Sequence, residues 1–453
     1  MTIRRVLIAN RGEIATRIIR TCRALGVETV LAASEADRDS TPARLADRTI
    51  CIGPPHPADS YLRIETVVQA ALGARADAIH PGYGFLSEHP GLARLCEQNG
   101  VVFIGPTAAQ IDAVADKVQA RSAAEAAGIP VVPGAMVESV ESALAAAGRI
   151  GTPLLVKAVG GGGGRGMKRV ERLEELPHAL ELAIAEAAAA FGDPRVFLER
   201  YLTGGRHIEV QVLGDGAGRV IHLGERDCSI QRRYQKLLEE APAPGLSEAL
   251  RRVLCADAVR YAERLSYRGA GTVEFLIDDR ETHYFLEMNA RIQVEHPVTE
   301  AVTGMDLVAE QIAIAGGAGL RLRQSDVRHS GCAIECRVNA EDPARDFRPS
   351  PGLVTDVSWP AGPGIRVDTH ITAGSRVPPY YDSLMAKIIA HGPDRPTAHE
   401  RMQHAIAATR VTGVATNLSF HARVLEEPRF RASGVSTGFV SELLGQDSVH
   451  TEA

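Results

Sequence analysis

The stretch 271–295 reads GTVEFLIDDRETHYFLEMNARIQVE and contains two β-rich runs, 271–277 and 283–289. The residues between them, 278–281, are polar and typical of a turn. Two β-rich runs around a short polar turn predict an antiparallel hairpin. This hairpin is the part of the sequence from which both the fold and a site can be inferred.

Two glutamates face each other in the expected hairpin. If Asp278 pairs with His283 in an antiparallel register, Glu274 lies opposite Glu287. Opposed carboxylates with Cβ atoms about 5 Å apart destabilise a sheet unless something positive lies between them. Oxygen ligands of this kind suit Mg²⁺ or Mn²⁺ carrying nucleotide phosphates. On the register alone, a solvent-exposed hairpin with splayed carboxylates is an equally good interpretation.

Polar side chains continue beyond the second run at every other position. With a period of two, an extended strand would gather on one side Glu287, Asn289, Arg291, Gln293 and Glu295. A guanidinium beside an amide and a carboxylate is well shaped to hold a small planar oxyanion and to deprotonate it. A solvated strand face would more often carry Lys, Thr and Ser, so the continuation favours a binding site. The run 333–339 alternates similarly and offers on one side Glu335, Arg337 and Asn339.

A glycine-rich loop follows another β-rich run. Five consecutive glycines, 160–164, come after the run 154–158 and would let backbone amides wrap closely around a ligand such as a triphosphate. Lys157, at the end of that run, would supply charge to phosphate oxygens. The alternative is a flexible linker, but linkers favour Ser and join polar segments, whereas this loop lies between two apolar stretches. It is not a Walker A loop, because no Gly-Lys-Ser/Thr follows.

The beginning of the chain predicts a βαβ unit of a parallel sheet. A strand at 6–9 is followed by apolar residues at helical spacing over 13–25 and by a second strand at 29–32. The turn at 10–13 lacks the Gly-x-Gly-x-x-Gly spacing, so a nicotinamide-dependent dehydrogenase is disfavoured. The predicted fold class is therefore α/β here, with a mixed α+β region after residue 320.

The composition is that of an ordinary globular protein. Of 453 residues, 45% are hydrophobic and 23% are charged, and the net charge of −6 includes no long basic run, so neither a nucleic-acid nor a membrane-surface partner is indicated. We find no apolar run of about eighteen residues and no signal peptide, which favours a cytoplasmic location. The seven cysteines include no Cys-x-x-Cys pair and are expected to be reduced.

The sequence resembles biotin carboxylase, a member of the ATP-grasp superfamily, over nearly the whole chain. The resemblance is carried by the glycine loop and by 8–15 (IANRGEIA), 80–88 (HPGYGFLSE), 225–233 (ERDCSIQRR) and 287–299 (EMNARIQVEHPVT). It implies a parallel α/β N-terminal domain at 1–112, an ATP-grasp domain at 113–320 with a mobile lid at about 131–203, a mixed α+β C-terminal domain at 321–446 and a tail at 447–453.

The resemblance also implies roles for individual residues of this chain. ATP would be held by Lys117, Lys157, Gly162, Gly163, Gly164, Met167, Glu199, Arg200, Tyr201, Leu202, His207, Gln231, Tyr234 and Leu276, with backbone amides of 199–202 reading adenine. The metal ions, Mg²⁺ or Mn²⁺, would be bound by Glu274, Glu287 and Asn289, in agreement with the hairpin. Bicarbonate would lie on Arg291, Gln293 and Val294. Glu295 resembles the general base, Lys236 would stabilise carboxyphosphate, Arg337 would stabilise the biotin enolate, and Tyr83 would lie near the biotin ring.

The implied reaction is the ATP-dependent carboxylation of biotin by bicarbonate through carboxyphosphate, the first half-reaction of an acyl-CoA carboxylase, with acetyl-CoA carboxylase of fatty acid synthesis as the expected enzyme. No Met-Lys-Met biotinylation sequence occurs, so we expect the biotin on a separate biotin carboxyl carrier protein. A carboxyltransferase subunit and a second copy of this chain, in a homodimer, are the other expected partners.

Two rival hypotheses remain from the sequence. One is another ATP-grasp ligase that makes an acylphosphate for attack by an amine, and the other is a catalytically silent regulatory relative. Tyr234 departs from the family, which usually has His at this position, and we expect the change to alter at most the affinity for nucleotide.

Overall fold

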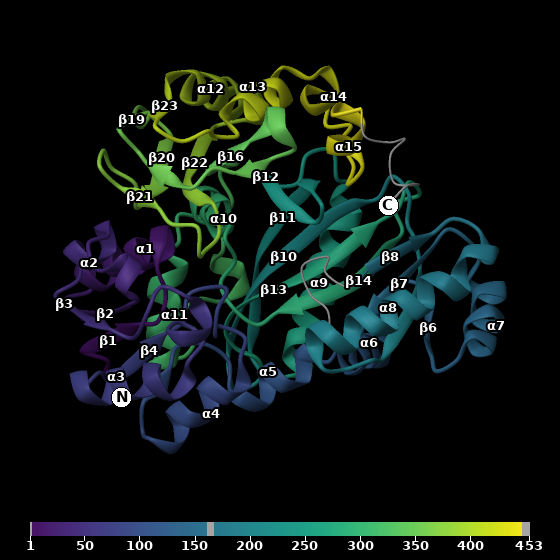
Figure 1. The fold of residues 1–453 in the computed structure, drawn as a ribbon, viewed down its shortest axis with the longest axis horizontal. Coiled ribbons are helices and arrows are strands. Elements are labelled where there is room, and N and C mark those ends of the chain that lie inside the picture. Colours follow the sequence, from purple (N-terminus) through teal and green to yellow (C-terminus); the bar gives the residue numbers. More distant parts are fainter. Residues whose placement is uncertain (1, 161–166, 446–453) are drawn as a thin grey trace.

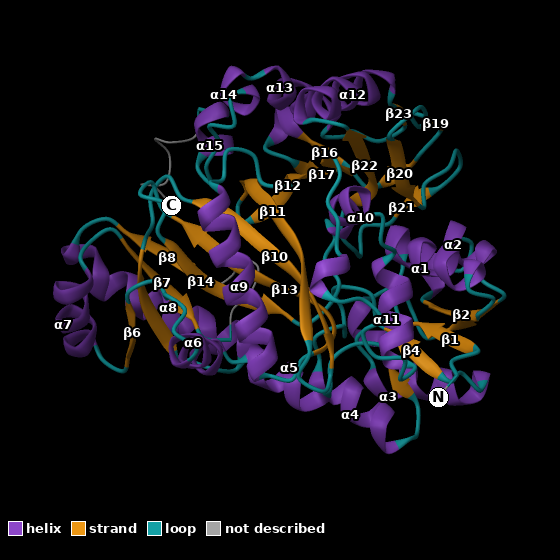
Figure 2. Ribbon diagram, turned by 180° about the vertical axis from the view of Figure 1, so that it is seen from behind, coloured by secondary structure: helices purple, strands orange, loops and turns teal. Residues whose placement is uncertain are grey.

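The fold is that of a computed structural model, which describes residues 2–160 and 167–445 (Figures 1 and 2). Gly162, Gly163 and Gly164 of the predicted phosphate loop and the expected tail at 447–453 lie outside these residues. Figure 1 shows a five-stranded sheet at the lower left, a long sheet through the centre and a smaller sheet at the right. None of the described helices is both long enough and apolar enough to cross a membrane. All seven cysteines are free, and most of them are buried.

The N-terminal sheet is parallel, with its strands in the order β3-β2-β1-β4-β5. The predicted βαβ unit is confirmed, since β1 is Arg5–Ile8, α1 is Gly12–Ala24 and β2 is Glu28–Ala33. Leu7 packs into one apolar cluster and its neighbour Ile8 into another, so both faces of the sheet are buried, as parallel strands require. The remaining elements of this region are β3 (Arg48–Cys51), β4 (Ala78–His80), β5 (Val102–Phe103), α2 (Thr41–Leu45), α3 (Ile64–Ala74), α4 (Pro90–Gln98) and α5 (Ala108–Ala115).

An antiparallel sheet of eight strands forms the centre of the molecule, in the order β14-β13-β10-β11-β12-β15-β22-β20. Its strands are β10 (Arg206–Asp215), β11 (Val220–Arg232), β12 (Gln235–Ala241), β13 (Arg268–Ile277), β14 (His283–Asn289), β15 (Cys332–Asn339), β20 (Ile365–Thr369) and β22 (Leu384–Gly392). The sheet continues through the predicted boundary at 320/321, because β12 pairs with β15. One ladder therefore joins the two expected domains, whose limits stay predictions.

Helices of the second half pack against this sheet: α9 contacts β10 and β11, α10 contacts β15, and α12 contacts β22. The helices are α9 (Glu248–Arg264), α10 (His296–Thr303), α11 (Leu307–Ala315), α12 (Arg395–Ala408), α13 (Leu418–Glu426), α14 (Pro428–Arg431) and α15 (Phe439–Leu443). Three short strand pairs border the sheet, namely β16 (Glu341–Asp342) with β17 (Arg348–Pro349), β18 (Gly352–Leu353) with β21 (Arg376–Val377), and β19 (Asp356–Ser358) with β23 (Arg410–Thr412).

A separate antiparallel sheet, in the order β6-β9-β7-β8, lies within the predicted lid. It consists of β6 (Gly134–Val137), β7 (Leu154–Ala158), β8 (Met167–Val170) and β9 (Val196–Arg200), with α7 (Val140–Ile150) and α8 (Leu176–Phe191) packed on it; α6 (Lys117–Ala126) precedes it. Figure 2 shows this unit at the left, beside the central sheet. Val156 and Leu180 belong to an apolar cluster of its own. A layer with its own core can move as one body, which is what a lid requires.

The predicted hairpin forms from β13 and β14, and Glu274 does lie opposite Glu287. The register near the turn is one residue away from the expected one, because His283 pairs with Ile277 and not with Asp278. A β-bulge directly after Glu274 accounts for the difference, since it places an extra residue on one strand. The glutamate pair was therefore predicted correctly through an assumption about the turn that was wrong.

The predicted extended line of polar residues also ends early. β14 ends at Asn289, and residues 290–295 form a loop that leads into α10. The amide of Ala290 donates to the side chain of Glu88 at 2.9 Å. Because this amide bonds a side chain of the N-terminal region and not a neighbouring strand, the ladder does not continue.

Candidate active site

A row of charged side chains crosses the central sheet. Strand pairing places Glu287 beside Glu274, Glu274 beside Glu209, and Glu209 beside Arg226. Arg226 is fully buried, and its guanidinium donates to Glu209 and, at 2.8 Å, to Gln211. Buried charges persist only where they are paired and hydrogen-bonded. The charged side chains of the row are therefore buried and held in place by one another. The alternative of an exposed hairpin with splayed carboxylates is wrong.

Lys236 on β12 joins this row to the loop before α10. Its Nζ lies 3.0 Å from Glu274 Oε1 and 2.7 Å from Glu295 Oε1, and it also contacts Glu209. Burial by itself would lower the pKa of this ammonium, but the three carboxylates raise it well above its usual value. Lys236 is therefore a fixed positive charge, which suits it to stabilise a developing anion and not to exchange a proton.

Glu295 lies between two cations and is itself fully buried. Its Oε1 accepts from Lys236, and its Oε2 accepts from Arg337 Nη2 at 2.8 Å. Burial would raise the pKa of this carboxyl, yet Lys236, Arg337 and then Arg226 hold the pKa well below its usual range. Glu295 is thus kept as a carboxylate, the protonation state that a general base needs.

Arg291 is oriented by the oxygen atoms of three side chains and by the backbone carbonyl of Ile292. Its Nε donates to Glu88 Oε2 at 2.8 Å, its Nη1 to Gln293 Oε1 at 2.7 Å and its Nη2 to Asn289 Oδ1 at 2.9 Å. Gln293 in turn donates from Nε2 to Glu274 Oε1 at 3.1 Å. The alternating polar residues therefore converge as predicted, although a loop and not a strand carries them.

The carboxylates of β13 and β14 fit a divalent cation. Burial and then the neighbouring Glu274 raise the pKa of Glu287, which is the effect of like charges that a cation between them would relieve. Lys117, at the start of α6, opposes this shift and so lies close by. Asn289 fits less directly: its Nδ2 donates to Glu274 Oε1 at 2.7 Å while its Oδ1 accepts from Arg291. As placed, its amide oxygen is turned toward the guanidinium.

The predicted nucleotide residues lie on both antiparallel sheets. The central sheet carries His207, Gln231 and Leu276, and Tyr234 lies in the turn between β11 and β12. His207 Nε2 is 2.8 Å from Glu274 Oε2, which brings it to the carboxylate pair. The lid sheet carries Lys157, Met167, Glu199 and Arg200, followed by Tyr201 and Leu202. Lys157 pairs with Met167 across β7 and β8, and its ammonium contacts Glu199.

Backbone hydrogen bonds at the end of β9 occupy some of the amides that were predicted to contact adenine. Arg200 N donates to Pro133 O at 2.9 Å, and Tyr201 N donates to Pro153 O at 2.9 Å. These two amides are already satisfied by the protein. The amide of Leu202 has no backbone acceptor among the described residues, so it is the one of these three amides that is free to contact adenine. The adenine contact itself stays a prediction.

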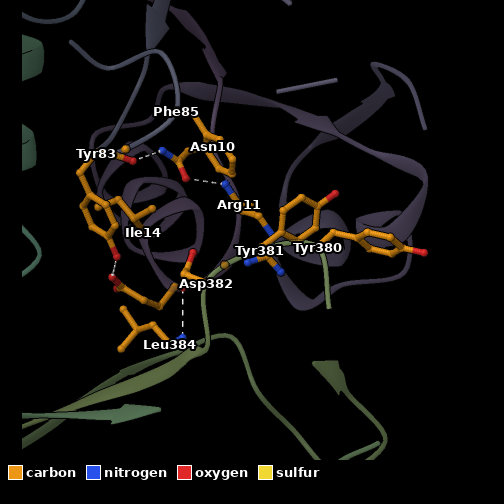
Figure 3. A pocket seen from close by; sticks show the side chains of 12 residues that line it. Asn10, Arg11, Ile14, Tyr83, Phe85, Tyr380, Tyr381, Asp382 and Leu384 are labelled. Atoms are coloured by element: carbon orange, nitrogen blue, oxygen red, sulfur yellow. Dashed lines mark hydrogen bonds between the residues drawn. The ribbon is translucent and has the colours of Figure 1, made fainter. Parts of the chain in front are cut away.

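A pocket of about 300 Å³ lies beside Tyr83, between the N-terminal region and the segment before β22 (Figure 3). Figure 3 shows Tyr381 and Asp382 across it from Tyr83. The hydroxyl of Tyr83 donates to the buried carboxyl of Glu13, which Lys387 Nζ approaches at 3.1 Å. Burial and then Glu13 raise the pKa of Tyr83 well above its usual value, so Tyr83 is a neutral hydrogen-bond donor.

Several side chains that hold the site together were missed from the sequence, namely Glu88, Glu209, Arg226, Glu239 and Lys387. Glu88 and Arg226 lie within quoted motifs, and Glu209 lies two residues after His207 on the same strand face, so a signal for these three was available. Glu239 accepts from Arg337 Nε at 2.6 Å, and Lys387, which is fully buried, donates to Val294 O at 2.8 Å. These two reach the site only through long-range strand pairing, for which the local sequence has no signal.

An antiparallel sheet with opposed carboxylates, next to a smaller antiparallel sheet, is the arrangement of the ATP-grasp class of ATP-dependent ligases. Residues 116–323 match the family described as "Carbamoyl-phosphate synthase L chain, ATP binding domain". Residues 2–111 and 335–442 match the N-terminal and C-terminal domains of biotin carboxylase, respectively. The chain belongs to the biotin carboxylase family.

Full-length similarities agree with these matches. A biotin carboxylase from Nostoc sp. is 50% identical over 445 residues, which cover 98% of this chain and 100% of that protein. The crystal structure of a biotin carboxylase complex with βγ-ATP from Campylobacter jejuni has a TM-score of 0.95 and 43% identity, and covers 97% of this chain and 99% of its own. The biotin carboxylase domain dimer of Hydrogenobacter thermophilus 2-oxoglutarate carboxylase, with MgADP, ADP and bicarbonate, has a TM-score of 0.94 and 45% identity over 98% of both chains.

Proposed function

We propose that this chain uses ATP and bicarbonate to carboxylate biotin on a separate carrier protein, as the first half-reaction of an acyl-CoA carboxylase, with acetyl-CoA as the final acceptor. The observation that carries the proposal is the contact of Glu295 with both Lys236 and Arg337, beside the pair Glu274 and Glu287. The carboxylate of Glu295 thus lies between Lys236, the proposed contact for carboxyphosphate, and Arg337, the proposed contact for biotin. A ligase that passes an acylphosphate to an amine has no evident need for Arg337 in this place.

The proposed binding site for metal and ATP is built around the carboxylates of the central sheet. Mg²⁺ or Mn²⁺ on Glu274 and Glu287 would neutralise charge on the ATP phosphates, and Asn289 would join them once its amide has turned. Lys117, Lys157 and His207 would contact the nucleotide from both antiparallel sheets, while the unit at 131–203 closes over it and excludes water.

The proposed carboxylation steps take place around Glu295. Bicarbonate held by Arg291, Gln293 and Val294 would lose its proton to Glu295, so that its oxygen can attack the γ-phosphate and release ADP. Lys236 would stabilise the resulting carboxyphosphate. Its breakdown gives CO₂ and a phosphate ion that takes the N1′ proton of biotin, and the biotin nitrogen then forms a bond to CO₂. Arg337 would stabilise the biotin enolate, and Tyr83 would lie beside its ring.

A 2-oxo acid is the second candidate for the final acceptor, because the biotin carboxylase domain of a 2-oxoglutarate carboxylase is 45% identical to this chain. Acceptor choice belongs to the carboxyltransferase, so the two candidates share every residue discussed above. A biotin carboxyl carrier protein, a carboxyltransferase subunit and a second copy of this chain are the proposed partners, in the cytoplasm. Purification of the native complex, followed by assay with acetyl-CoA, pyruvate and 2-oxoglutarate, distinguishes the acceptors.

Bicarbonate-dependent hydrolysis of ATP, stimulated by free biotin, tests the proposed reaction. We expect hydrolysis to require bicarbonate and to rise on addition of biotin, and we expect Arg337→Ala to lose the rise. Hydrolysis that depends on an amine and ignores biotin would instead indicate another ATP-grasp ligase. The absence of any hydrolysis with intact folding and bound nucleotide would indicate a silent relative.

A further inference from the structure

Glu335 on β15 is a carboxyl group that the proposed reaction does not use. It is fully buried, and neither of its oxygens has a hydrogen-bond partner among the described residues. An ionised carboxylate that is buried without a partner is strongly unfavourable. The protonated, neutral form of Glu335 is therefore favoured, and this form can donate to an acceptor that lies close to it.

Glu239 on β12 is that neighbouring group, because it lies directly across from Glu335 in the antiparallel ladder. Facing residues of such strands have Cβ atoms about 5 Å apart, which lets two carboxyl groups form a hydrogen bond. Glu239 is also fully buried; its Oε1 accepts from Arg337 Nε at 2.6 Å, while its Oε2 has no partner in the described chain. The two side chains lie on the same face of the sheet, so one proton shared between them would satisfy an unbonded oxygen of each.

The surroundings of the pair favour a single shared proton. The charged and titratable groups that interact with the pair are Arg337 on the same strand, Lys387 on β22, Lys236 on β12, Cys228 on β11 and Glu295, which directly precedes α10. Lys387 is already bonded to Val294 O and lies 3.1 Å from Glu13. The opposite face of β15 packs through Cys336 and other apolar residues against α12.

The electrostatic effects agree with this geometry. Burial, and then Glu239, raise the pKa of Glu335 well above its usual value, against the opposing effect of Lys387. Burial raises the pKa of Glu239 to about 7, although Arg337 opposes the shift. Two adjacent carboxyls that titrate together in this way hold one proton between them over a wide range of pH.

We propose that Glu239 and Glu335 share one proton and act as a positioning pair behind Arg337. Oε1 of Glu239 contacts both Nε and Nη2 of the guanidinium, and Nη2 also donates to Glu295. Glu335 neutralises the second oxygen of Glu239 and so fixes the orientation of that carboxylate. The effect on catalysis rests on the proposed role of Arg337 in binding biotin, whereas the shared proton does not depend on it.

Infrared spectroscopy of the full chain in D₂O tests the shared proton. We expect the wild type at pH 7 to show the carbonyl stretch of a buried protonated carboxyl group, and Glu335→Gln to lack it. Glu240→Gln is the matched control, because Glu240 is the next residue on β12 and both of its oxygens bond Arg395; this variant keeps the band. A wild-type spectrum without the band, or a band that survives Glu335→Gln, overturns the proposal.

Kinetics with free biotin test the positioning role. Glu335→Gln can donate the same hydrogen bond, so we expect kcat/KM for biotin to stay within about threefold of wild type. Glu335→Leu leaves Oε2 of Glu239 without a partner, so we expect kcat/KM for biotin to fall by about tenfold or more, with KM for ATP unchanged. If Arg337→Ala leaves kcat/KM for biotin unchanged, the proposed function of Arg337 fails. If Arg337→Ala lowers it and Glu335→Leu does not, only the positioning pair fails.

Discussion

Glu295 and Glu335 are both fully buried glutamates of one site, yet their surroundings shift their pKa values in opposite directions. Both oxygens of Glu295 accept from cations, Lys236 and Arg337, and the pKa of Glu295 is well below its usual range. Neither oxygen of Glu335 has a partner among the described residues, and burial raises its pKa well above that range. Burial alone therefore does not decide the charge of a carboxyl group; the groups within hydrogen-bond distance decide it.

The largest expected effect is on catalysis by Glu295. Glu295→Gln keeps the shape of the side chain but removes the base, so we expect kcat for bicarbonate-dependent ATP hydrolysis to fall roughly 10²–10⁴-fold. Steady-state assays at saturating ATP and bicarbonate measure this. A fall of less than about tenfold, with nucleotide binding intact, would mean that Glu295 is not the general base.

The next effect concerns the stability of the carboxylate row. Arg226→Met leaves Glu209 as a buried carboxylate without its guanidinium, which costs about 3–5 kcal/mol when one partner of a buried pair is removed. Chemical denaturation monitored by fluorescence measures the loss. The double variant Arg226→Met/Glu209→Gln should recover part of it, since the carboxylate that lost its guanidinium is gone; equal stability of the two variants would count against the pairing.

Stability as a function of pH should differ in sign between the two glutamates. The raised pKa of Glu335 means that the folded state binds more protons than the unfolded state above pH 4.5, so the stability of the wild type relative to Glu335→Gln falls as pH rises from there toward the folded pKa. The depressed pKa of Glu295 gives the reverse, with stability relative to Glu295→Gln lost as pH falls below 4.5.

Denaturation midpoints of the three proteins between pH 2 and pH 9 measure these slopes, each at most about 1.4 kcal/mol per pH unit. Parallel curves for both variants would mean that the two carboxyls do not differ in charge, and the comparison would then be wrong.

The smallest expected effect is at the nucleotide edge. Tyr234 is 47% exposed and has a φ of 64°, a left-handed conformation that His adopts more readily than most residues. We expect Tyr234→His to shift KM for ATP by a few-fold at most and to leave kcat and thermal stability unchanged. An unchanged KM would show that this departure from the family pattern has no effect on nucleotide affinity.

The sequence predicted those features that depend on neighbours along the chain. The opposed pair Glu274 and Glu287 was predicted because a short turn joins their strands, although the β-bulge beside them was not. The convergence of Arg291 and Glu295 was also predicted, but as a strand, because the contact of Glu88 that ends the ladder comes from a distant region. A local pattern has no information on such contacts.

The partners that set the protonation states could not be predicted. Glu239 meets Glu335 through the pairing of β12 with β15, and Glu209 meets Glu274 through the pairing of β10 with β13. These strands are far apart in the sequence, and only the folded sheet brings their side chains together. The roles of the site residues stay predictions, and their charges depend on contacts that the fold alone creates.

Whether Glu295 is the general base and Glu335 only a positioning residue is tested by comparing Glu295→Gln and Glu335→Gln with wild type. The measured quantity is the transfer of labelled carboxyl from bicarbonate to the biotin of a purified carrier domain. The two variants make the same isosteric change at equally buried positions. We predict that Glu295→Gln abolishes measurable transfer, while Glu335→Gln transfers at a rate close to wild type. Equal rates for the two variants would show that Glu295 and Glu335 do not have these different roles.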